Sequence, residues 1–217
     1  KTENINKILI IKIDQDWQEN MSNLKVSKKP EGDSVLTRTK SRKLKKEAGI
    51  GRILEFDPAR SDKVKNVAFL LFTMVGKTLR FCLTKETRGF YGTIGGHVES
   101  FDKRPFGAAK REFREEVGTH LPRISILYTI DYIHANGDIT RFYVGRYDEY
   151  IKFDIKNVKK DRHGNIEVSG LYFMRISEVE KRILKPDTSR MPIRECARKS
   201  LKVILPYLKS KHPKIFA

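Results

Sequence analysis

The sequence has little of several features that mark specialised protein classes. It contains 217 residues with only two cysteines, Cys82 and Cys196, and a single tryptophan. Two cysteines without a metal-binding spacing exclude a disulfide scaffold or a zinc finger and favour free thiols. The longest apolar run, residues 67–75, has about half the length that crosses a bilayer, and no apolar signal-peptide core is present. We therefore expect an intracellular protein of the cytoplasm or nucleus, with no membrane association.

Acidic residues are also scarce relative to basic ones. Lys plus Arg number 45 against 27 Asp plus Glu, which gives a formal net charge of +18. Such an excess indicates a polyanionic partner, with RNA foremost, although an anionic membrane surface or a highly phosphorylated small molecule would respond to the same field. The length suits one domain with a sizeable core.

The positive charge is densest near the N-terminus. Residues 25–52 are rich in Lys, Arg, Ser and Gly, and they offer few side chains for burial. We therefore divide the chain into a basic extension, residues 1–52, with a strand expected at residues 7–13, and a globular domain, residues 53–217. The nucleic-acid contacts that we expect are the cations of the densest run: Arg38, Lys40, Arg42, Lys43, Lys45 and Lys46.

One short segment combines glycines with an acidic helix. Residues 95–118 read GGHVESFDKRPFGAAKREFREEVG. Good helix formers predict a helix over residues 105–117, because a proline is tolerated in the first turn, and Gly118 is suited to a left-handed cap. Three carboxylates would share one face of this helix: Glu112, Glu115 and Glu116.

Carboxylates held together in this way repel one another, which raises their pKa values unless a cation is supplied. Arg111 can pair with Glu115 one turn later, but one guanidinium does not neutralise three carboxylates. Clustered hard oxygen ligands suit Mg²⁺ or Mn²⁺. From the residues alone, a solvated acidic helix face is an equally good interpretation.

The segment resembles the signature of the Nudix hydrolases. That pattern is Gly, five residues, Glu, seven residues, then Arg-Glu, an apolar residue, any residue, Glu-Glu, any residue and Gly. The matching positions are Gly96, Arg111, Glu112, Phe113, Glu115, Glu116 and Gly118.

Two departures from the family pattern fall in the loop before the helix. Asp102 stands where the family has glutamate, and eight residues rather than seven separate it from Arg111. The extra residue should fall within residues 100–104 and leave the three helical glutamates in register. Asp102 is either the counterpart of the family's glutamate or an N-terminal cap of the helix.

The resemblance implies an α/β/α sandwich with a mixed sheet, and hydrolysis of a nucleoside diphosphate linked to another moiety. It implies that Mg²⁺ or Mn²⁺ is held by Glu112, Glu115, Glu116 and the carbonyl of Gly96, with Glu99 as a further ligand. It also implies that Arg111 orients a glutamate. The general base stays open among Glu115, Glu116 and Glu167, the last lying outside the helix.

The hydrophobic pattern outside this segment predicts the remaining elements. Strands are expected at 52–56, 66–75, 78–84, 91–98, 124–134 and 139–148, with a further hairpin of 153–158 and 166–175. Helices are expected at 177–184 and 193–205, the second ending because of Pro206.

The substrate is argued from aromatic residues and charge. Stacking on a base or cap is expected from Trp17, Phe90, Tyr91 or Tyr143. A Nudix domain with a basic extension is similar to the mRNA decapping enzymes of large DNA viruses and of eukaryotic cells, so capped RNA is the leading substrate. The alternatives are an ADP-ribose or other nucleoside-diphosphate pyrophosphatase, a diphosphoinositol phosphatase, and a non-catalytic RNA-binding Nudix fold.

Overall fold

The structure is a computed structural model that describes residues 51–147, 151–184 and 192–216. Its elements in chain order are β1 (Arg52–Glu55), the 3₁₀ helix η1 (Pro58–Lys63), β2 (Val64–Val75), β3 (Thr78–Glu86), β4 (Tyr91–Gly92), β5 (Ile94–His97), α3 (Pro105–Val117), β6 (Ser125–Ile133), β7 (Ile139–Arg146), β8 (Val168–Arg175), α4 (Ile176–Leu184), α5 (Glu195–Lys211) and α6 (Pro213–Phe216). The strand predicted at residues 7–13 lies outside the described residues.

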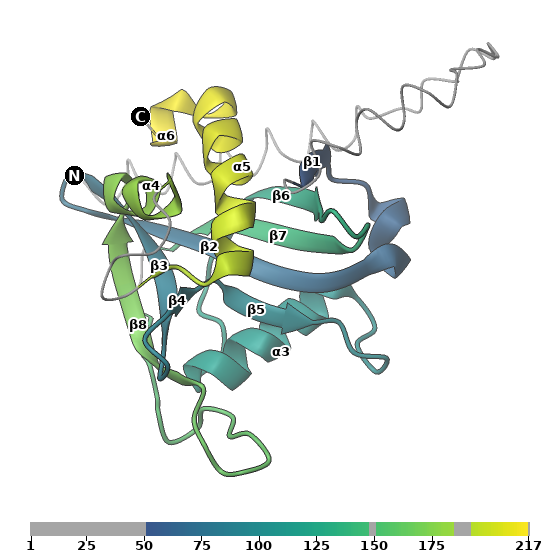
Figure 1. The fold of residues 1–217 in the computed structure, drawn as a ribbon, viewed down its shortest axis with the longest axis vertical. Helices are drawn as coiled ribbons and strands as arrows, with labels where there is room; N and C mark the ends of the chain where they lie inside the picture. The colour runs from purple at the N-terminus through teal and green to yellow at the C-terminus, as the bar shows by residue number, and fades with distance from the viewer. Residues whose placement is uncertain (1–50, 148–150, 185–191, 217) are drawn as a thin grey trace, which may run out of the picture. The chain divides into compact units, whose positions relative to one another are not determined.

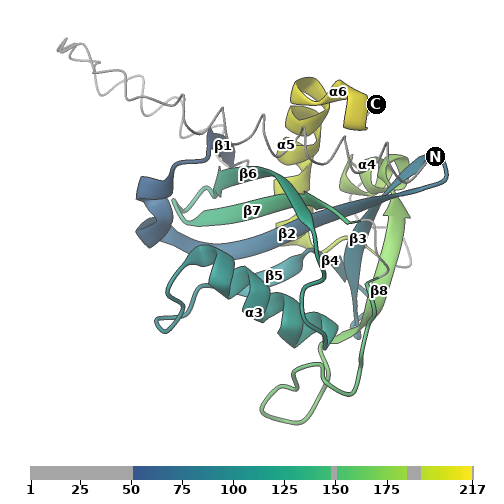
Figure 2. The same ribbon diagram turned by 180° about the vertical axis from the view of Figure 1, so that it is seen from behind.

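The described strands form one mixed sheet in the order β1-β6-β7-β2-β3-β4, with β5 paired to β2 and β8 paired to β3. Most neighbours are antiparallel, but β2 and β7 run parallel at the centre. Helix α3 covers one face of the sheet, and α5 with α4 and α6 covers the other (Figures 1 and 2). The α/β/α sandwich with a mixed sheet is therefore confirmed.

Two pairs of consecutive predicted strands form hairpins with a glycine in the turn. The connection between β6 and β7 closes with a hydrogen bond from His134 N to Asp138 O, and Gly137 adopts a φ of 92°. The connection between β2 and β3 turns at Gly76, with a φ of 61°. Glycine carries no steric penalty in this left-handed region, which explains why both strand pairs are separated at a glycine.

Each face of the sheet has its own apolar core. Along β2, Val67, Phe69 and Leu71 pack on the α3 side, whereas the alternate residues Leu70 and Phe72 pack on the α5 side. This alternation is the period-two pattern of a strand that is buried on both faces. The sheet thus holds α3 and α5 apart, on opposite surfaces.

Three expectations about elements are wrong. Residues 153–158 form no strand; this segment makes turns, and only Lys160 and Ile166 form an isolated bridge. The strand expected at 91–98 is divided into β4 and β5. Helix α5 continues through Pro206 to Lys211, because its apolar side chains are buried on both sides of the proline. None of the helices in the described ranges combines the length and hydropathy needed to cross a membrane.

A buried ion pair ties the sheet to η1. Asp131 of β6 and Arg141 of β7 are direct cross-strand partners, with Nε and Oδ1 separated by 2.7 Å, and the two side chains are 0% and 2% exposed. Arg60 of η1 donates to the other oxygen of Asp131 and pairs with Asp57. Buried charges persist only when they are paired and hydrogen-bonded, so this cluster is part of the scaffold.

Candidate active site

Helix α3 is fixed on the sheet by its apolar face. Ala108, Ala109, Phe113 and Val117 are buried, and the Phe113 ring packs edge-on against Phe69 with centroids 6.1 Å apart. Gly118 ends the helix at φ 77°, donating its N–H to Arg114 O, so the predicted left-handed cap is confirmed. Anchoring one face of α3 in this way leaves its acidic face against β5.

The two glycines of β5 let the acidic face come close. A Cβ atom on Gly96 would lie 2.5 Å from Cδ of Glu112, and one on Gly95 would lie 2.1 Å from the carbonyl oxygen of Val67. Gly95 N donates to Oε2 of Glu116 at 2.9 Å. Any side chain on Gly96 would therefore displace Glu112 from the backbone of β5.

The pKa of Glu116 is raised well above its usual range, first of all because the carboxyl group is buried. The hydrogen bond from Gly95 opposes this increase, whereas the nearby carboxylates of Glu112, Glu167 and Glu86 add to it. The pKa of Glu112 is raised as well, again chiefly by burial and against the effect of Arg111. Both carboxyl groups are held where an added positive charge would stabilise their ionised form.

Arg111 binds several of these groups at once. Its Nη1 donates to Oε1 of Glu112 at 2.7 Å and to Oε1 of Glu115 at 3.3 Å, so the predicted pairing with Glu115 is confirmed. Its Nη2 donates to the His97 carbonyl at 2.8 Å and to Oδ2 of Asp102 at 2.9 Å. One guanidinium thus joins α3, β5 and the intervening loop, and the pKa of Arg111 is raised above its usual value mainly by Asp102.

The interpretation of Asp102 as a helix cap is wrong. The N-cap residue of α3 is Arg104, and its side chain makes no capping hydrogen bond. Asp102 instead accepts hydrogen bonds from Arg111 and from the backbone N–H of Glu99. These bonds to the charged form, led by the one from Arg111, lower the pKa of Asp102.

Two residues of the site, Glu86 and Arg194, are missing from the sequence interpretation. Glu86, the last residue of β3, is 8% exposed, and burial is the main reason for its raised pKa. The Arg194 guanidinium lies 3.4 Å from Glu86 and 3.8 Å from Glu167. Arg194 is held there by backbone: its N–H donates to Tyr91 O, next to the parallel bridge between Tyr91 and Ile193. Only tertiary structure brings these residues together.

The remaining predicted ligands and bases occupy different surroundings. Glu167 immediately precedes β8, its side chain is 70% exposed, and its carbonyl accepts from Thr87 N. Glu99 is exposed on the loop before α3. Glu115 is turned toward Lys159, whose ammonium lies 2.6 Å from Oε2. The structure therefore brings Glu86 and Glu167 near Glu116 and gives Glu115 two basic partners.

Two of the predicted stacking residues are placed elsewhere. Tyr91 and Tyr143 are 3% and 7% exposed, and they pack in the α5-side and α3-side cores respectively. Burial leaves neither ring a free face, so their assignment as substrate platforms is wrong. Phe90 is 36% exposed and keeps an accessible ring. Trp17 and the basic run of residues 38–46 lie outside the described residues.

The donor set of this site fits a hard divalent cation by charge. As the side chains stand, no three His, Cys, Asp or Glu residues of the described ranges surround a common point that could hold a metal ion. Three glutamates nevertheless interact electrostatically with Glu116: Glu86, Glu112 and Glu167. Arg194 is the cationic neighbour of Glu86, Glu116 and Glu167. Carboxylate oxygen in such excess is the ligand type that Mg²⁺ and Mn²⁺ prefer.

The sequence was compared with models of known protein families and with proteins of curated function. The sequence model of the NUDIX domain matches residues 62–193. No protein with a curated description matches the chain.

The solved structures to which this chain is similar are distant from it in sequence. The NUDIX domain of Shewanella oneidensis NrtR, complexed with ADP ribose, is 18% identical over 70% of this chain and 94% of that one, with a TM-score of 0.43. The Nudix hydrolase RenU from M. smegmatis is 14% identical over 70% and 89% of the two chains, with a TM-score of 0.49. The Bacillus subtilis pyrophosphohydrolase BsRppH is 16% identical over 76% and 90%, with a TM-score of 0.45.

Proposed function

The chain belongs to the Nudix family, and from this premise we propose that it is a metal-dependent hydrolase that cuts a diphosphate linkage, with the 5′ cap of RNA as its substrate. The observation that carries the catalytic part is the contact between α3 and β5, where Glu112 and Glu116 lie against Gly96 and Gly95. This contact places two half-buried glutamates against the half-buried backbone of β5.

The proposed metal ligands are Glu112, Glu115, Glu116 and the Gly96 carbonyl, with Glu99 as an outer candidate. A bound Mg²⁺ or Mn²⁺ would neutralise charge on the diphosphate and lower the pKa of a coordinated water molecule. Glycine at position 96 keeps the strand backbone open to Glu112, because any Cβ atom there would collide with that carboxylate.

Arg111 acts as a positioning residue in this proposal. Its hydrogen bonds to Asp102 and to the His97 carbonyl fix the guanidinium, which in turn fixes Glu112 and Glu115. Asp102 therefore supports the arginine rather than the helix terminus. A site organised before substrate arrives loses less free energy in ordering its groups during the reaction.

The proton acceptor is one of two glutamates, Glu116 or Glu167. Burial raises the pKa of Glu116, which moves it toward the range where a carboxylate works as a general base near neutral pH. Glu167 is the more exposed and lies near Glu116 from the start of β8. Glu115 is the weaker candidate, because Arg111 and Lys159 both bind its carboxylate.

The choice of RNA rests on charge. A formal net charge of +18 exceeds what one small nucleotide requires, whereas a chain of phosphates interacts with many cations at once. We propose that residues 1–52 form a basic extension that guides the RNA body, and that residues 53–217 form the catalytic domain. The cations proposed for this guidance are those of residues 38–46.

Substrate competition tests this function directly. The full chain with Mg²⁺ should release labelled m7GDP from capped RNA much faster than it hydrolyses the free cap dinucleotide or ADP-ribose. Raising the salt concentration should reduce the advantage of capped RNA, because contacts with the RNA body are electrostatic. Equal turnover of the free nucleotides would reject the RNA assignment in favour of a nucleotide pyrophosphatase. Absence of turnover with either metal would favour a non-catalytic RNA-binding protein.

A further inference from the structure

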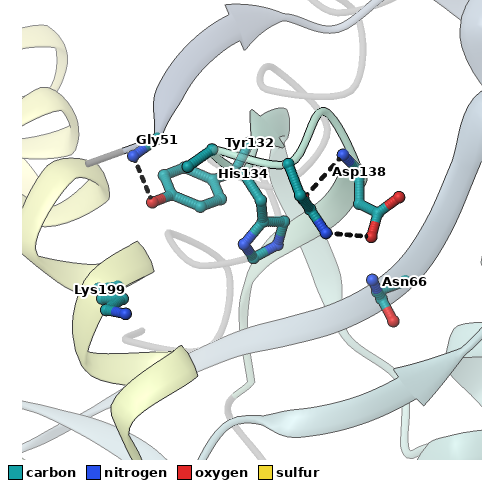
Figure 3. Close-up of a pocket in the computed structure, with 8 residues that line it drawn as sticks. Gly51, Asn66, Tyr132, His134, Asp138 and Lys199 are labelled. Atoms are coloured by element: carbon teal, nitrogen blue, oxygen red, sulfur yellow. Dashed lines mark hydrogen bonds between the residues drawn. The ribbon is translucent and has the colours of Figure 1, made fainter. Parts of the chain in front are cut away.

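An open pocket of about 350 Å³ lies on the α5 face of the sheet (Figure 3). This volume falls within the range of about 300–1,000 Å³ that small-molecule sites occupy. The pocket is formed by the ends of strands and by the first turns of α5. Its lining residues are Gly51, Asn66, Tyr132, His134, Ala135, Asn136, Asp138 and Lys199.

The pocket adjoins the candidate active site through β5. A Cβ atom on Gly96 would point at Glu112, so Gly96 faces α3, and by strand alternation the next residue, His97, faces the opposite surface. His97 pairs with Asn66, which lines the pocket, and Gly96 pairs with the adjacent Val67. The pocket and the acidic helix therefore lie at neighbouring positions on opposite faces of the sheet, so a ligand that reached both would have to pass the edge of β5.

The back wall of the pocket is held by tertiary contacts. The buried Tyr132 hydroxyl accepts the Gly51 N–H at 2.9 Å, and a Cβ atom on Gly51 would collide with the Tyr132 ring. The half-buried His134 ring packs edge-on against Tyr132 with centroids 4.8 Å apart, and its Nε2 is 2.7 Å from the Thr140 hydroxyl. Because the Tyr132 ring and the Thr140 hydroxyl hold the His134 ring in place, a ligand that stacked on it would lose little free energy in ordering this side chain.

Groups of opposite charge line the rest of the pocket. Asp138 and Asn66 lie on one side and Lys199 on the other, with His134 between them (Figure 3). One Asp138 oxygen accepts from the Asn136 amide at 2.7 Å, and no side chain of the described ranges donates to the second oxygen, which could accept from a ligand. Lys199 pairs only with the exposed Glu195 at 2.9 Å among the described residues, and such a surface pair is easily exchanged for another anion or acceptor.

A guanine base matches this set of groups. Its Watson–Crick edge carries N1–H and N2–H donors next to the O6 acceptor, and the usual protein partners of such groups are carboxylates and cations respectively. Adenine carries an amino group where guanine has O6, and it lacks the N1–H and N2–H donors. It would therefore leave Asp138 without a donor and present a donor to Lys199.

We propose that this pocket binds the guanine base of the nucleotide substrate, with the second Asp138 oxygen accepting from N1–H, Lys199 donating to O6, and His134 stacking on the ring. This inference rests on the proposed function, because it supplies the base site for the diphosphate that the α3 carboxylates would hydrolyse. Asn66, next to β5, would contact the sugar on its way to the acidic helix.

Calorimetric titration of the full chain with GDP and with ADP tests the pocket. EDTA is present throughout, so that the proposed metal-dependent hydrolysis cannot occur during the measurement. The two probes have the same phosphates, so any difference in affinity comes from the base. GDP should bind roughly tenfold or more tightly than ADP, as a matched pair of base contacts provides. Asp138→Asn should weaken GDP binding roughly tenfold and leave ADP binding unchanged.

Lys199→Ala provides an independent variant, because it does not alter the turn that Asp138 supports. It should weaken GDP binding by a smaller factor than Asp138→Asn does. The matched controls are Asp62→Asn and Lys202→Ala, two exposed residues outside the pocket lining, of which Lys202 lies on the same helix as Lys199. Both controls should bind GDP as the unaltered chain does.

Equal affinity for GDP and ADP would overturn the pocket, as would unchanged GDP binding by both Asp138→Asn and Lys199→Ala. These outcomes are independent of the proposed hydrolysis. A chain that prefers GDP and loses that preference in the two variants, but cuts no capped RNA, supports the pocket and rejects the catalytic proposal. A chain that cuts capped RNA while binding GDP and ADP equally supports catalysis and rejects the pocket.

Discussion

Arg141 and Arg111 each hold a cluster of carboxylates, but the charges balance around only one of them. Around Arg141, the two arginines Arg141 and Arg60 face the two aspartates Asp131 and Asp57. Arg141 also donates hydrogen bonds to the Ser61 hydroxyl and to the Asp57 carbonyl, and Asp131 is fully buried. Nothing further is needed to neutralise it, which is the property of a structural ion pair.

Around Arg111 the acids are in excess. Arg111 pairs with Asp102, Glu112 and Glu115, and within the described ranges Lys159 pairs with Glu115 alone. Glu116 is next to this cluster with a backbone N–H as its hydrogen-bond donor. Local charge balance, rather than the presence of an arginine or of buried acids, thus separates the candidate site from the scaffold.

The largest effect expected from this difference concerns Glu116. Glu116→Gln should lower kcat by about a hundredfold to ten-thousandfold, because it removes a charged ligand or base without changing the size of the side chain. The melting temperature should stay within a few degrees of that of the unaltered chain. Glu180→Gln, which breaks a half-exposed pair with Lys209 outside the candidate site, is the matched control and should retain full activity. Full activity of Glu116→Gln would remove the basis of the proposed site.

Substitution in the cluster around Arg141 should lower stability and leave kcat unchanged. Asp131→Asn should lower the free energy of unfolding by about 3–5 kcal/mol, because it leaves the buried Arg141 charge without its partner. Urea denaturation followed by circular dichroism measures this loss. The fraction that remains folded should keep its kcat, and the exposed Asp62→Asn should leave both quantities unchanged. A loss of kcat without loss of stability would show that this cluster also serves the reaction.

A substitution that keeps the positive charge at position 111 tests the difference between the two clusters more finely. Arg111→Lys should lower kcat by roughly tenfold to a hundredfold, because an ammonium group cannot bridge Asp102, Glu112 and the His97 carbonyl in the same geometry. Stability should fall much less than in Asp131→Asn. Parallel measurement of kcat and of the urea midpoint separates the two effects, and an unchanged kcat would restrict Arg111 to a structural role.

The smallest expected effect concerns the reactivity of Cys82, which should stay unchanged when the site residues are substituted. Cys82 of β3 is buried, which raises its pKa to about 12, so at pH 8 it stays a thiol that cannot react as a thiolate. A thiol reagent should modify the exposed Cys196 and spare Cys82 until denaturant is added. The same result with Glu116→Gln and Arg111→Lys would show that these variants leave the core closed. Rapid reaction of Cys82 in either variant would mean that its kinetic defect reflects loosened packing.

Local chemistry explains which parts of this molecule can be predicted from the sequence. The bounds of α3 and its cap at Gly118 depend on residues within a few positions of one another, and they are correct. The function of Asp102 depends on Arg111 reaching back from the helix, which helix-capping rules do not include. Pro206 is accepted within α5 because burial of the surrounding helix outweighs one lost hydrogen bond.

The substrate side is harder to predict for a geometrical reason. Aromatic residues at alternate strand positions have the same pattern whether a helix covers them or solvent does, so Tyr91 and Tyr143 could not be distinguished from exposed platforms. Glu86 and Arg194 are far apart in the sequence, and they meet only because the segment before α5 pairs with β4. No spacing rule within the chain would have joined them.

The parallel pairing of β2 with β7 has a consequence for how the protein is made. Antiparallel neighbours such as β6 and β7 can close through a short turn, but β2 must wait for a partner that follows the whole of α3 in the chain. Closing so long a loop carries an entropic cost before any contact compensates for it, which slows folding. A nascent chain that already contains residues 95–118 would therefore still lack β7. The sheet against which α3 packs would not yet be complete.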